Sequence, residues 1–178
     1  MTDTDRLVLR DWRESDLAPW AAMNADPAVR GHLGPLLTPA QAEDSVRRFR
    51  GDLARNGFGF WAVDVRETGA FIGLTGLDPV EPGMPVSGVE VGWRLARSAW
   101  GHGYATEAAA ATLAFGFDTA GLEEILAITV AGNARSQAVM RRLGMTHAPE
   151  DDFDDPDEPP GPLRRQLVFR VRRATVSR

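Results

Sequence analysis

Residues 89–106 read VEVGWRLARSAWGHGYAT, and this stretch is the most informative part of the chain. Val89–Leu95 is predicted to be a strand, a loop bearing Gly101 and Gly103 follows, and an alanine-rich helix is expected from about Tyr104 to Phe117. Glycines let a ligand approach the backbone, and the first N–H groups of a helix are unpaired and carry partial positive charge. The stretch therefore predicts a phosphate-binding strand–loop–helix unit, unless the two glycines serve only to turn the chain.

The same stretch does not fit a dinucleotide-binding fingerprint. Thr106 stands where the third glycine of GxGxxG belongs. Glu123 and Glu124 lie before the next strand rather than at its end, where the ribose-binding carboxylate of such folds is found. An oxidoreductase that binds a dinucleotide is therefore disfavoured.

A second signal lies at the end of the next strand. Ile125–Val130 is apolar throughout, which is typical of a central strand, and Asn133-Ala-Arg-Ser136 opens the following helix. Asn133 either only caps this helix or, together with Ser136, faces a ligand that lies between the two strand–helix units. The residues leave both interpretations open.

The remaining sequence predicts a mixed sheet with helices on both faces, in a single domain over residues 1–178. Further strands are expected over 6–13, 60–65, 71–77 and 163–171. Helices are expected over 16–24 after a Ser15 cap, from a capping box at Thr38 to a stop at Gly57, and over 133–143. The acidic, proline-broken stretch 150–161 is expected to be a loop without regular structure.

Composition removes several kinds of chemistry. All 20 basic residues are arginine, so a Schiff-base lysine and a P-loop lysine are excluded. There is no cysteine, and the three histidines show no metal-ligand spacing, so no metal site is expected. A net charge of −5 argues against nucleic acid as a partner, and no apolar run or secretory signal points to a membrane. A cytoplasmic protein is the simplest expectation.

Four motifs in this order resemble the GNAT superfamily of acetyl-CoA-dependent N-acetyltransferases, and more narrowly its RimJ/RimL-type branch. They are DRLVLRDWRESDL, FIGLTGL, GWRLARSAWGHGYATEA and NARSQAVMRRLGM, and DDFDDP resembles a late loop of part of the branch. The resemblance covers nearly the whole chain. It implies an α/β (α+β) fold with a mixed, mostly antiparallel central sheet flanked by helices on both faces.

The resemblance also implies acetyl-CoA as co-substrate and no metal. Backbone amides near Trp93–Leu95 would hold the oxyanion, and the loop and two helix starts would hold the coenzyme. The implied coenzyme contacts are Trp93, Leu95, Arg97, Ser98, Gly101, His102, Gly103, Tyr104, Ala105, Thr106, Asn133, Arg135 and Ser136. Many members carry a tyrosine in the last helix that protonates the leaving thiolate. Met140 occupies the corresponding position here, so Ser136 is the candidate for that role.

Direct attack of a neutral amine on the thioester requires a proton acceptor. Glu90, on the strand that leads to the loop, is the first candidate, and His147 is a weaker one. The acceptor is expected to be a protein or peptide N-terminal α-amine or a small-molecule amine. The acidic stretch 150–158 either attracts a cationic acceptor or is simply solvated. The alternative function is a non-catalytic acyl-CoA-binding or sensing domain of the same fold, and a homodimer is left open.

Overall fold

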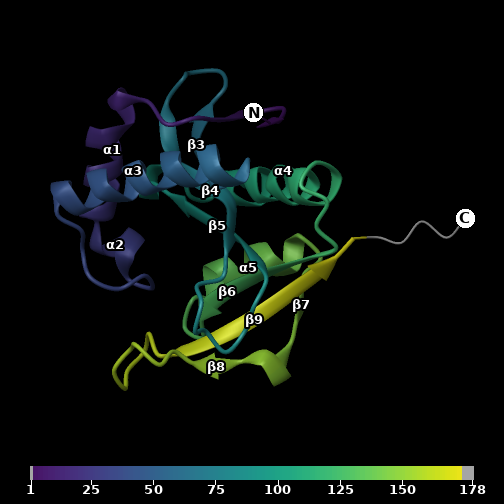
Figure 1. The fold of residues 1–178 in the computed structure, drawn as a ribbon. Coiled ribbons are helices and arrows are strands. Elements are labelled where there is room, and N and C mark those ends of the chain that lie inside the picture. Colours follow the sequence, from purple (N-terminus) through teal and green to yellow (C-terminus); the bar gives the residue numbers. More distant parts are fainter. Residues whose placement is uncertain (1, 174–178) are drawn as a thin grey trace, which may run out of the picture.

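The computed structural model describes residues 2–173, and one nine-stranded sheet runs through them (Figure 1). The order is β1-β2-β3-β4-β5-β6-β9-β7, with β8 also paired to β9. Only β5 and β6 are parallel among these pairs, so the sheet is mixed and mostly antiparallel, as expected. The strands are β1 Thr2–Asp3, β2 Leu7–Arg10, β3 Phe60–Val65, β4 Phe71–Pro79, β5 Val89–Leu95, β6 Glu124–Val130, β7 Thr146–His147, β8 Phe153–Asp154 and β9 Arg165–Arg172.

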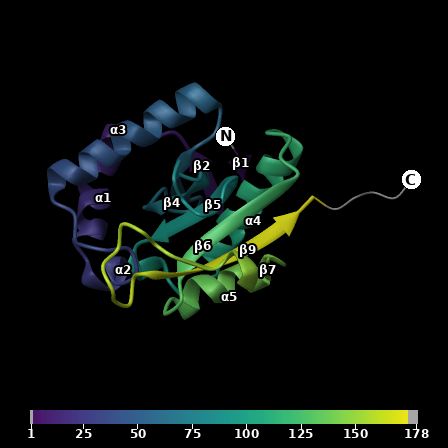
Figure 2. The ribbon, with the colours of Figure 1, turned by 60° about the horizontal axis from the view of Figure 1, so that its bottom comes forward.

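Helices cover both faces of the sheet, which confirms the predicted fold class. One face carries α1 (Leu17–Asn24), α2 (Pro27–Arg30) and α3 (Pro39–Asn56), whose apolar residues pack on Ala62 and Leu74. The other face carries α4 (Tyr104–Asp118) and α5 (Ala134–Arg142), which pack on residues such as Leu77 and Ile125. Figure 2 shows β6 and β9 side by side, with α3 and α5 on opposite sides of them.

Short-range sequence signals predicted several helix ends correctly. The Thr38 side chain accepts from Gln41 N and the Gln41 side chain accepts from Thr38 N, so α3 begins with the predicted capping box. Gly57 ends α3 with a φ of 72°, a left-handed conformation that favours glycine. Asn133 caps α5 by accepting from Ser136 N at 3.2 Å. These ends depend on contacts within a few residues of sequence, which is why the sequence shows them.

Two expectations were wrong. Ser15 does not cap a helix: it lies inside a short 3-10 helix, η1 (Glu14–Asp16), which runs directly into α1. The acidic stretch 150–161 is not free of regular structure, because it contains the end of η3 (Pro149–Asp151) and the whole of β8, which pairs with β9. Phe153 supplies the reason, since its ring is buried against Val86 and Val168. A third 3-10 helix, η2 (Arg97–Ala99), follows β5.

Candidate active site

The site begins where the two parallel strands separate. β5 and β6 share a single register pair, Glu90 with Leu126. Beyond that pair β5 stays bonded to β4 as far as Leu95, whereas β6 stays bonded to β9 as far as Val130. Across this fork the backbones of β5 and β6 do not pair with each other, although the Leu95 carbonyl accepts from Trp100 Nε1 and the Val130 carbonyl accepts from Asn133 N.

The predicted phosphate-binding loop and helix start, residues 101–106, lie beside this fork and are called the cradle below. Gly101 and Gly103 have φ values of 83° and 80°, and a Cβ at Gly101 would meet no atom within 4 Å. No side chain caps α4, and its first helical bond joins Glu107 N to Gly103 O at 3.1 Å. The amides of Tyr104, Ala105 and Thr106 precede that bond and have no intrahelical acceptor. The glycine conformations and these amides fit a coenzyme pyrophosphate.

A cavity of about 840 Å³ joins the fork to the cradle. Ten of the sequence-predicted residues line it, from β5, the loop, the start of α4 and the start of α5. They are Trp93, Leu95, Gly101, Gly103, Tyr104, Ala105, Thr106, Asn133, Arg135 and Ser136. The two strand–helix units therefore face one space, as the second interpretation of Asn133 and Ser136 required.

Four predicted residues do not line this cavity. Arg97 and Ser98 lie exposed on η2, and the exposed His102 stacks on the Tyr104 ring, with centroids 5.4 Å apart. Glu90 lies at the closed end of the fork, at the single pair that holds β5 to β6. The short helix η2 turns the chain between β5 and the two glycines, and Arg97 on it faces solvent.

Asn133 both caps α5 and orients Ser136. Its Nδ2 donates to Ser136 Oγ at 3.1 Å while its Oδ1 accepts from Ser136 N. The serine hydroxyl therefore receives a hydrogen bond and keeps its own proton available for donation into the cavity. Met140, by contrast, is 2% exposed and packs in the core.

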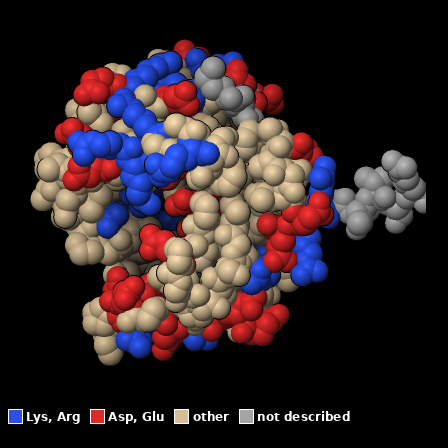
Figure 3. All heavy atoms as spheres, viewed as in Figure 1, with Lys and Arg blue, Asp and Glu red and all other residues tan. Residues whose placement is uncertain are grey.

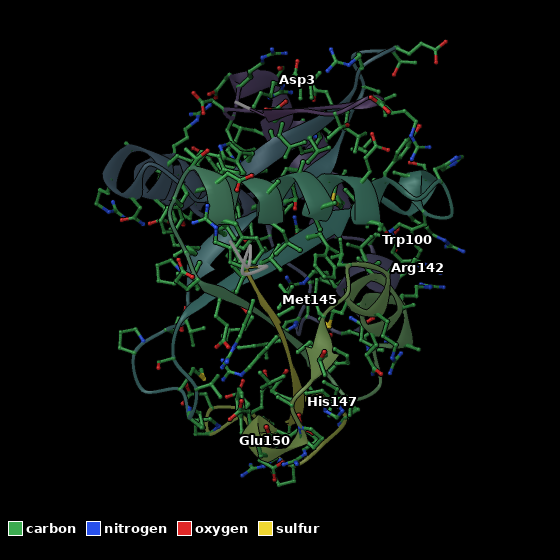
Figure 4. The ribbon with its side chains drawn as sticks, turned by 90° about the vertical axis from the view of Figure 1, so that its right-hand side faces the viewer. Asp3, Trp100, Arg142, Met145, His147 and Glu150 are labelled. Atoms are coloured by element: carbon green, nitrogen blue, oxygen red, sulfur yellow. The ribbon has the colours of Figure 1, made fainter. Side chains whose placement is uncertain are left out.

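Two cavity residues, Trp100 and Arg142, were not among the contacts predicted from the sequence. The guanidinium carbon of Arg135 lies 4.4 Å from the centre of the Trp100 ring, so this pair joins α5 to the loop. Arg142 lines the same cavity, and Figure 4 shows Arg142 beside Trp100 at one edge of the molecule. Within residues 2–173, Arg142 forms no ion pair. The helical pattern of α5 does not show that the Arg142 side chain lies at a cavity wall without a carboxylate partner in the described range.

The loop between α2 and α3 closes the other side of the cavity. His32 and Leu33 line both the large cavity and a second one of about 230 Å³, whose lining includes Asp155 and Glu158. Arg30 fixes this loop by donating to Leu33 O at 2.7 Å and to Pro35 O at 2.9 Å. His32 is thus a site residue that sequence analysis missed. It lies far from β5 and α5 in the sequence, and only the folding of the chain brings it to the cavity.

Glu90 has a carboxyl group tuned toward neutral pH. Burial, and then the negative charges of Asp78 and Glu81, raise its pKa to about 7. Asp78 is its direct cross-strand neighbour on β4, and burial also raises the pKa of Asp78. Within the described residues no buried side-chain oxygen lacks a hydrogen-bond partner, and Glu90 makes no side-chain hydrogen bond, so its carboxyl oxygens keep some access to solvent.

His147 lies away from this site. Its Nε2 is 3.0 Å from both carboxyl oxygens of Asp152, and its ring stacks on Phe169. Figure 4 places His147 and Glu150 near the bottom of the view, below Trp100 and Arg142. In residues 2–173 no group of three or more histidine, aspartate or glutamate side chains is arranged to hold a metal ion. None of the helices in this range is long and apolar enough to cross a membrane.

Known proteins resemble this chain in both sequence and fold. Residues 6–146 match the family model described as an acetyltransferase (GNAT) domain. The uncharacterized protein YkkB of Bacillus subtilis is 30% identical over 146 residues, covering 82% of this chain and 84% of YkkB. An acetyltransferase from Agrobacterium tumefaciens superimposes with a TM-score of 0.79 at 27% identity, over 96% of this chain and 93% of that one.

RimL, a ribosomal L7/L12 alpha-N-protein acetyltransferase solved in complex with coenzyme A, superimposes with a TM-score of 0.77. The identity is 14%, with 95% of each chain covered, so this likeness concerns the fold. The fork, the cradle and the cavity define an acyl-CoA-dependent transferase. The chain belongs to the GNAT acetyltransferase family and is an acetyl-CoA-dependent enzyme that acetylates an amine.

The cavity arginines lead to a test of coenzyme binding. Replacing Arg142 or Arg135 with glutamine is expected to raise the Kd for coenzyme A about tenfold, the usual value of a hydrogen bond to a charged group. The measurement is titration calorimetry with coenzyme A, and Arg47→Gln on the outer face of α3 is the matched control. If Arg97→Gln weakens binding as much as Arg142→Gln, the coenzyme lies further along the loop than the cavity indicates.

Proposed function

We propose that this enzyme transfers the acetyl group directly from acetyl-CoA to a primary amine in a ternary complex, with Glu90 as the proton acceptor. The observation that carries the proposal is the half-buried Glu90 carboxyl at the closed end of the fork, with its pKa near 7. A base with a pKa near the working pH combines a useful ionised fraction with a useful affinity for protons.

The reaction needs no covalent enzyme intermediate. The amine nitrogen forms a bond to the thioester carbonyl carbon, and the bond from that carbon to sulfur breaks. The amine proton passes to Glu90 through a water molecule, because Glu90 keeps solvent access but does not line the cavity. Ser136 donates its hydroxyl proton in a hydrogen bond to the departing thiolate, and unpaired amides of β5 face the carbonyl oxygen.

The acceptor we propose is an α-amine, either of a protein or peptide N-terminus or of a small molecule. An α-amino group titrates near about 8 and a lysine side chain near about 10.4. Glu90, with a pKa near 7, deprotonates the less basic amine more readily. The chain contains no lysine, so its own side chains do not compete for the acetyl group.

The test is amine-dependent release of free coenzyme A thiol. A panel of α-amines and lysine side-chain amines at neutral pH is expected to give release that depends on the amine, with α-amines turned over faster. The acetylated products are then identified by mass spectrometry. Equal or better turnover of lysine side chains would contradict the proposed acceptor class. Coenzyme binding without release in the presence of any amine would contradict the proposed reaction.

A further inference from the structure

An arginine projects toward the cavity from the sheet face that carries α1–α3. Arg94 on β5 donates from Nη1 to Asn24 Oδ1 at 2.7 Å, and its guanidinium carbon lies 5.2 Å from the centre of the Trp20 ring. Asn24 is fully buried and donates to Trp20 O at 2.8 Å. These contacts hold the guanidinium group in one orientation and leave its other donors available.

Arg94 has no counter-charge of its own. Among residues 2–173 no carboxylate lies within ion-pair distance of Arg94, and its two basic neighbours are poorly neutralised. Arg30 is 7% exposed and donates only to carbonyl oxygens, and Arg48 reaches Asp78 at 3.8 Å. Burial, and then the charges of Arg30 and Arg48, lower the pKa of Arg94 to about 10.

Arg94 lines the same cavity as the pyrophosphate cradle, but it projects from the other face of the sheet. The cradle is built by the loop after η2 and by α4, which covers the opposite face of the sheet from α1–α3. Arg94 instead meets α1 and lies close to Arg30 and Arg48, whose side chains come from α2 and α3. Figure 3 shows a hollow on this side of the molecule, with basic and acidic residues both present along it.

An acidic group lies on the same sheet face at the other end of the fork. Side chains alternate along a strand, so Glu90, Gly92 and Arg94 face the same way, and the first and last are separated by about 13 Å along the strand. The side chain between them is only a glycine, over which the Phe60 ring packs. This face of β5 therefore carries a carboxyl group near one end and, near the other, a guanidinium group that lines the cavity.

We propose that Arg94 is an anion-binding subsite for the acceptor, so that the preferred acceptor is an amine that also carries a carboxylate. This rests on the proposed function, because the subsite is defined relative to the reacting amine. A guanidinium group presents parallel N–H donors that match the two oxygens of a carboxylate. Arg30 and Arg48 strengthen the positive potential without touching the acceptor.

The experiment measures binding apart from turnover. N-acetylated amino acids and their neutral amides, which are matched products, are titrated against the coenzyme A complex by calorimetry. The acids are expected to bind at least about tenfold more tightly than the amides, and Arg94→Gln is expected to remove that difference. Arg47→Gln, a surface variant of the same chemistry, should keep it. Equal binding of acids and amides to the unaltered protein would overturn the proposal.

Measurements of turnover distinguish failure of the Arg94 subsite from failure of the proposed reaction. Thiol release is compared for amino acids and their amides, and the acids should show the higher kcat/KM. Arg94→Gln should lower kcat/KM for the acids and leave the Kd of coenzyme A within about twofold of its original value. A rise in the coenzyme Kd as large as the loss for the acids would mean that Arg94 binds coenzyme, and would overturn the subsite. Acid-selective binding without any thiol release would overturn the reaction and keep the subsite.

Discussion

Replacing Glu90 with glutamine is expected to lower kcat roughly 10²–10⁴-fold, the usual contribution of a positioned general base. Glutamine has nearly the same shape as glutamate but cannot accept the amine proton. The Kd of coenzyme A should change little, because Glu90 does not line the cavity. Stopped-assay thiol release and calorimetry on the same preparation measure the two quantities.

The pH profile of kcat/KM gives a second readout for Glu90. The base must be ionised, so kcat/KM of the unaltered enzyme should contain a limb that rises with pH through the Glu90 pKa of about 7, beside the limb that the α-amine itself gives at about 8. Glu90→Gln should remove the first of these limbs. Histidine side chains titrate in a similar range, so the profile alone does not identify the group. His32 lines the cavity, and His32→Gln is therefore the deciding companion variant. A larger loss in His32→Gln than in Glu90→Gln would assign the base to His32.

Glu90 should also make stability depend on pH. Burial raises its folded-state pKa from 4.5 to about 7, so between these values the folded protein holds a proton that the unfolded chain has released. The free energy of unfolding therefore falls as pH rises through this window, and the loss is complete above pH 7. Glu90→Gln should have the higher Tm at pH 8 and a nearly equal Tm below pH 4.5.

Replacing Arg10 with leucine is expected to reduce the free energy of unfolding by about 3–5 kcal/mol, as when one partner of a buried ion pair is removed. Arg10 is 4% exposed and bonds two buried carboxylates. It donates to Asp16 from Nη1 at 2.7 Å and from Nη2 at 2.8 Å, and to Asp64 from Nε at 2.6 Å. The substitution leaves both carboxylates buried without that partner. Urea unfolding monitored by circular dichroism measures the change.

The pH dependence distinguishes lost charge pairing from lost packing. Burial opposes ionisation of Asp16, yet its hydrogen bonds with Arg10 and the Arg13 amide lower its pKa below 3.8. That contribution is present above the unfolded value and is lost as pH falls below it. In Arg10→Leu the unpaired carboxylates can take up protons instead, so the deficit should shrink between pH 8 and pH 4. A deficit that does not change with pH would indicate lost packing alone.

A matched surface variant provides the scale for this measurement. Arg47 pairs with Glu43 and Asp44 on the exposed face of α3, and Arg47→Leu should cost no more than about 1 kcal/mol. The Arg10 cluster joins β2, β3 and η1, and η1 continues into α1, which carries Trp20 and Asn24. Loss of the Arg10 ion pairs is therefore also expected to disturb the contacts of Arg94 with Asn24 and Trp20.

The sequence predicted the parts of this protein that depend on near neighbours in the chain. The alternation in Val89–Leu95 indicates a strand, the glycines before Tyr104 indicate a cradle, and Thr38 with Gln41 indicates a helix start. Each of these needs only a few residues and backbone geometry. The acidic stretch was misjudged because β8 forms through Phe153, whose burial depends on Val168 in another strand.

Which of these residues lie together depends on contacts between elements that are far apart in the chain. The fork exists because, beyond the Glu90–Leu126 pair, β5 pairs only with β4 and β6 pairs only with β9. The pKa of Glu90 depends on burial and on Asp78 across the strand, and the charge around Arg94 depends on two separate helices. Desolvation and Coulomb forces act through space, so residues far apart in the chain set them. The sequence was enough to predict an acetyltransferase fold with a candidate phosphate-binding loop, and the packing of distant elements placed the charged groups of Glu90 and Arg94 relative to it.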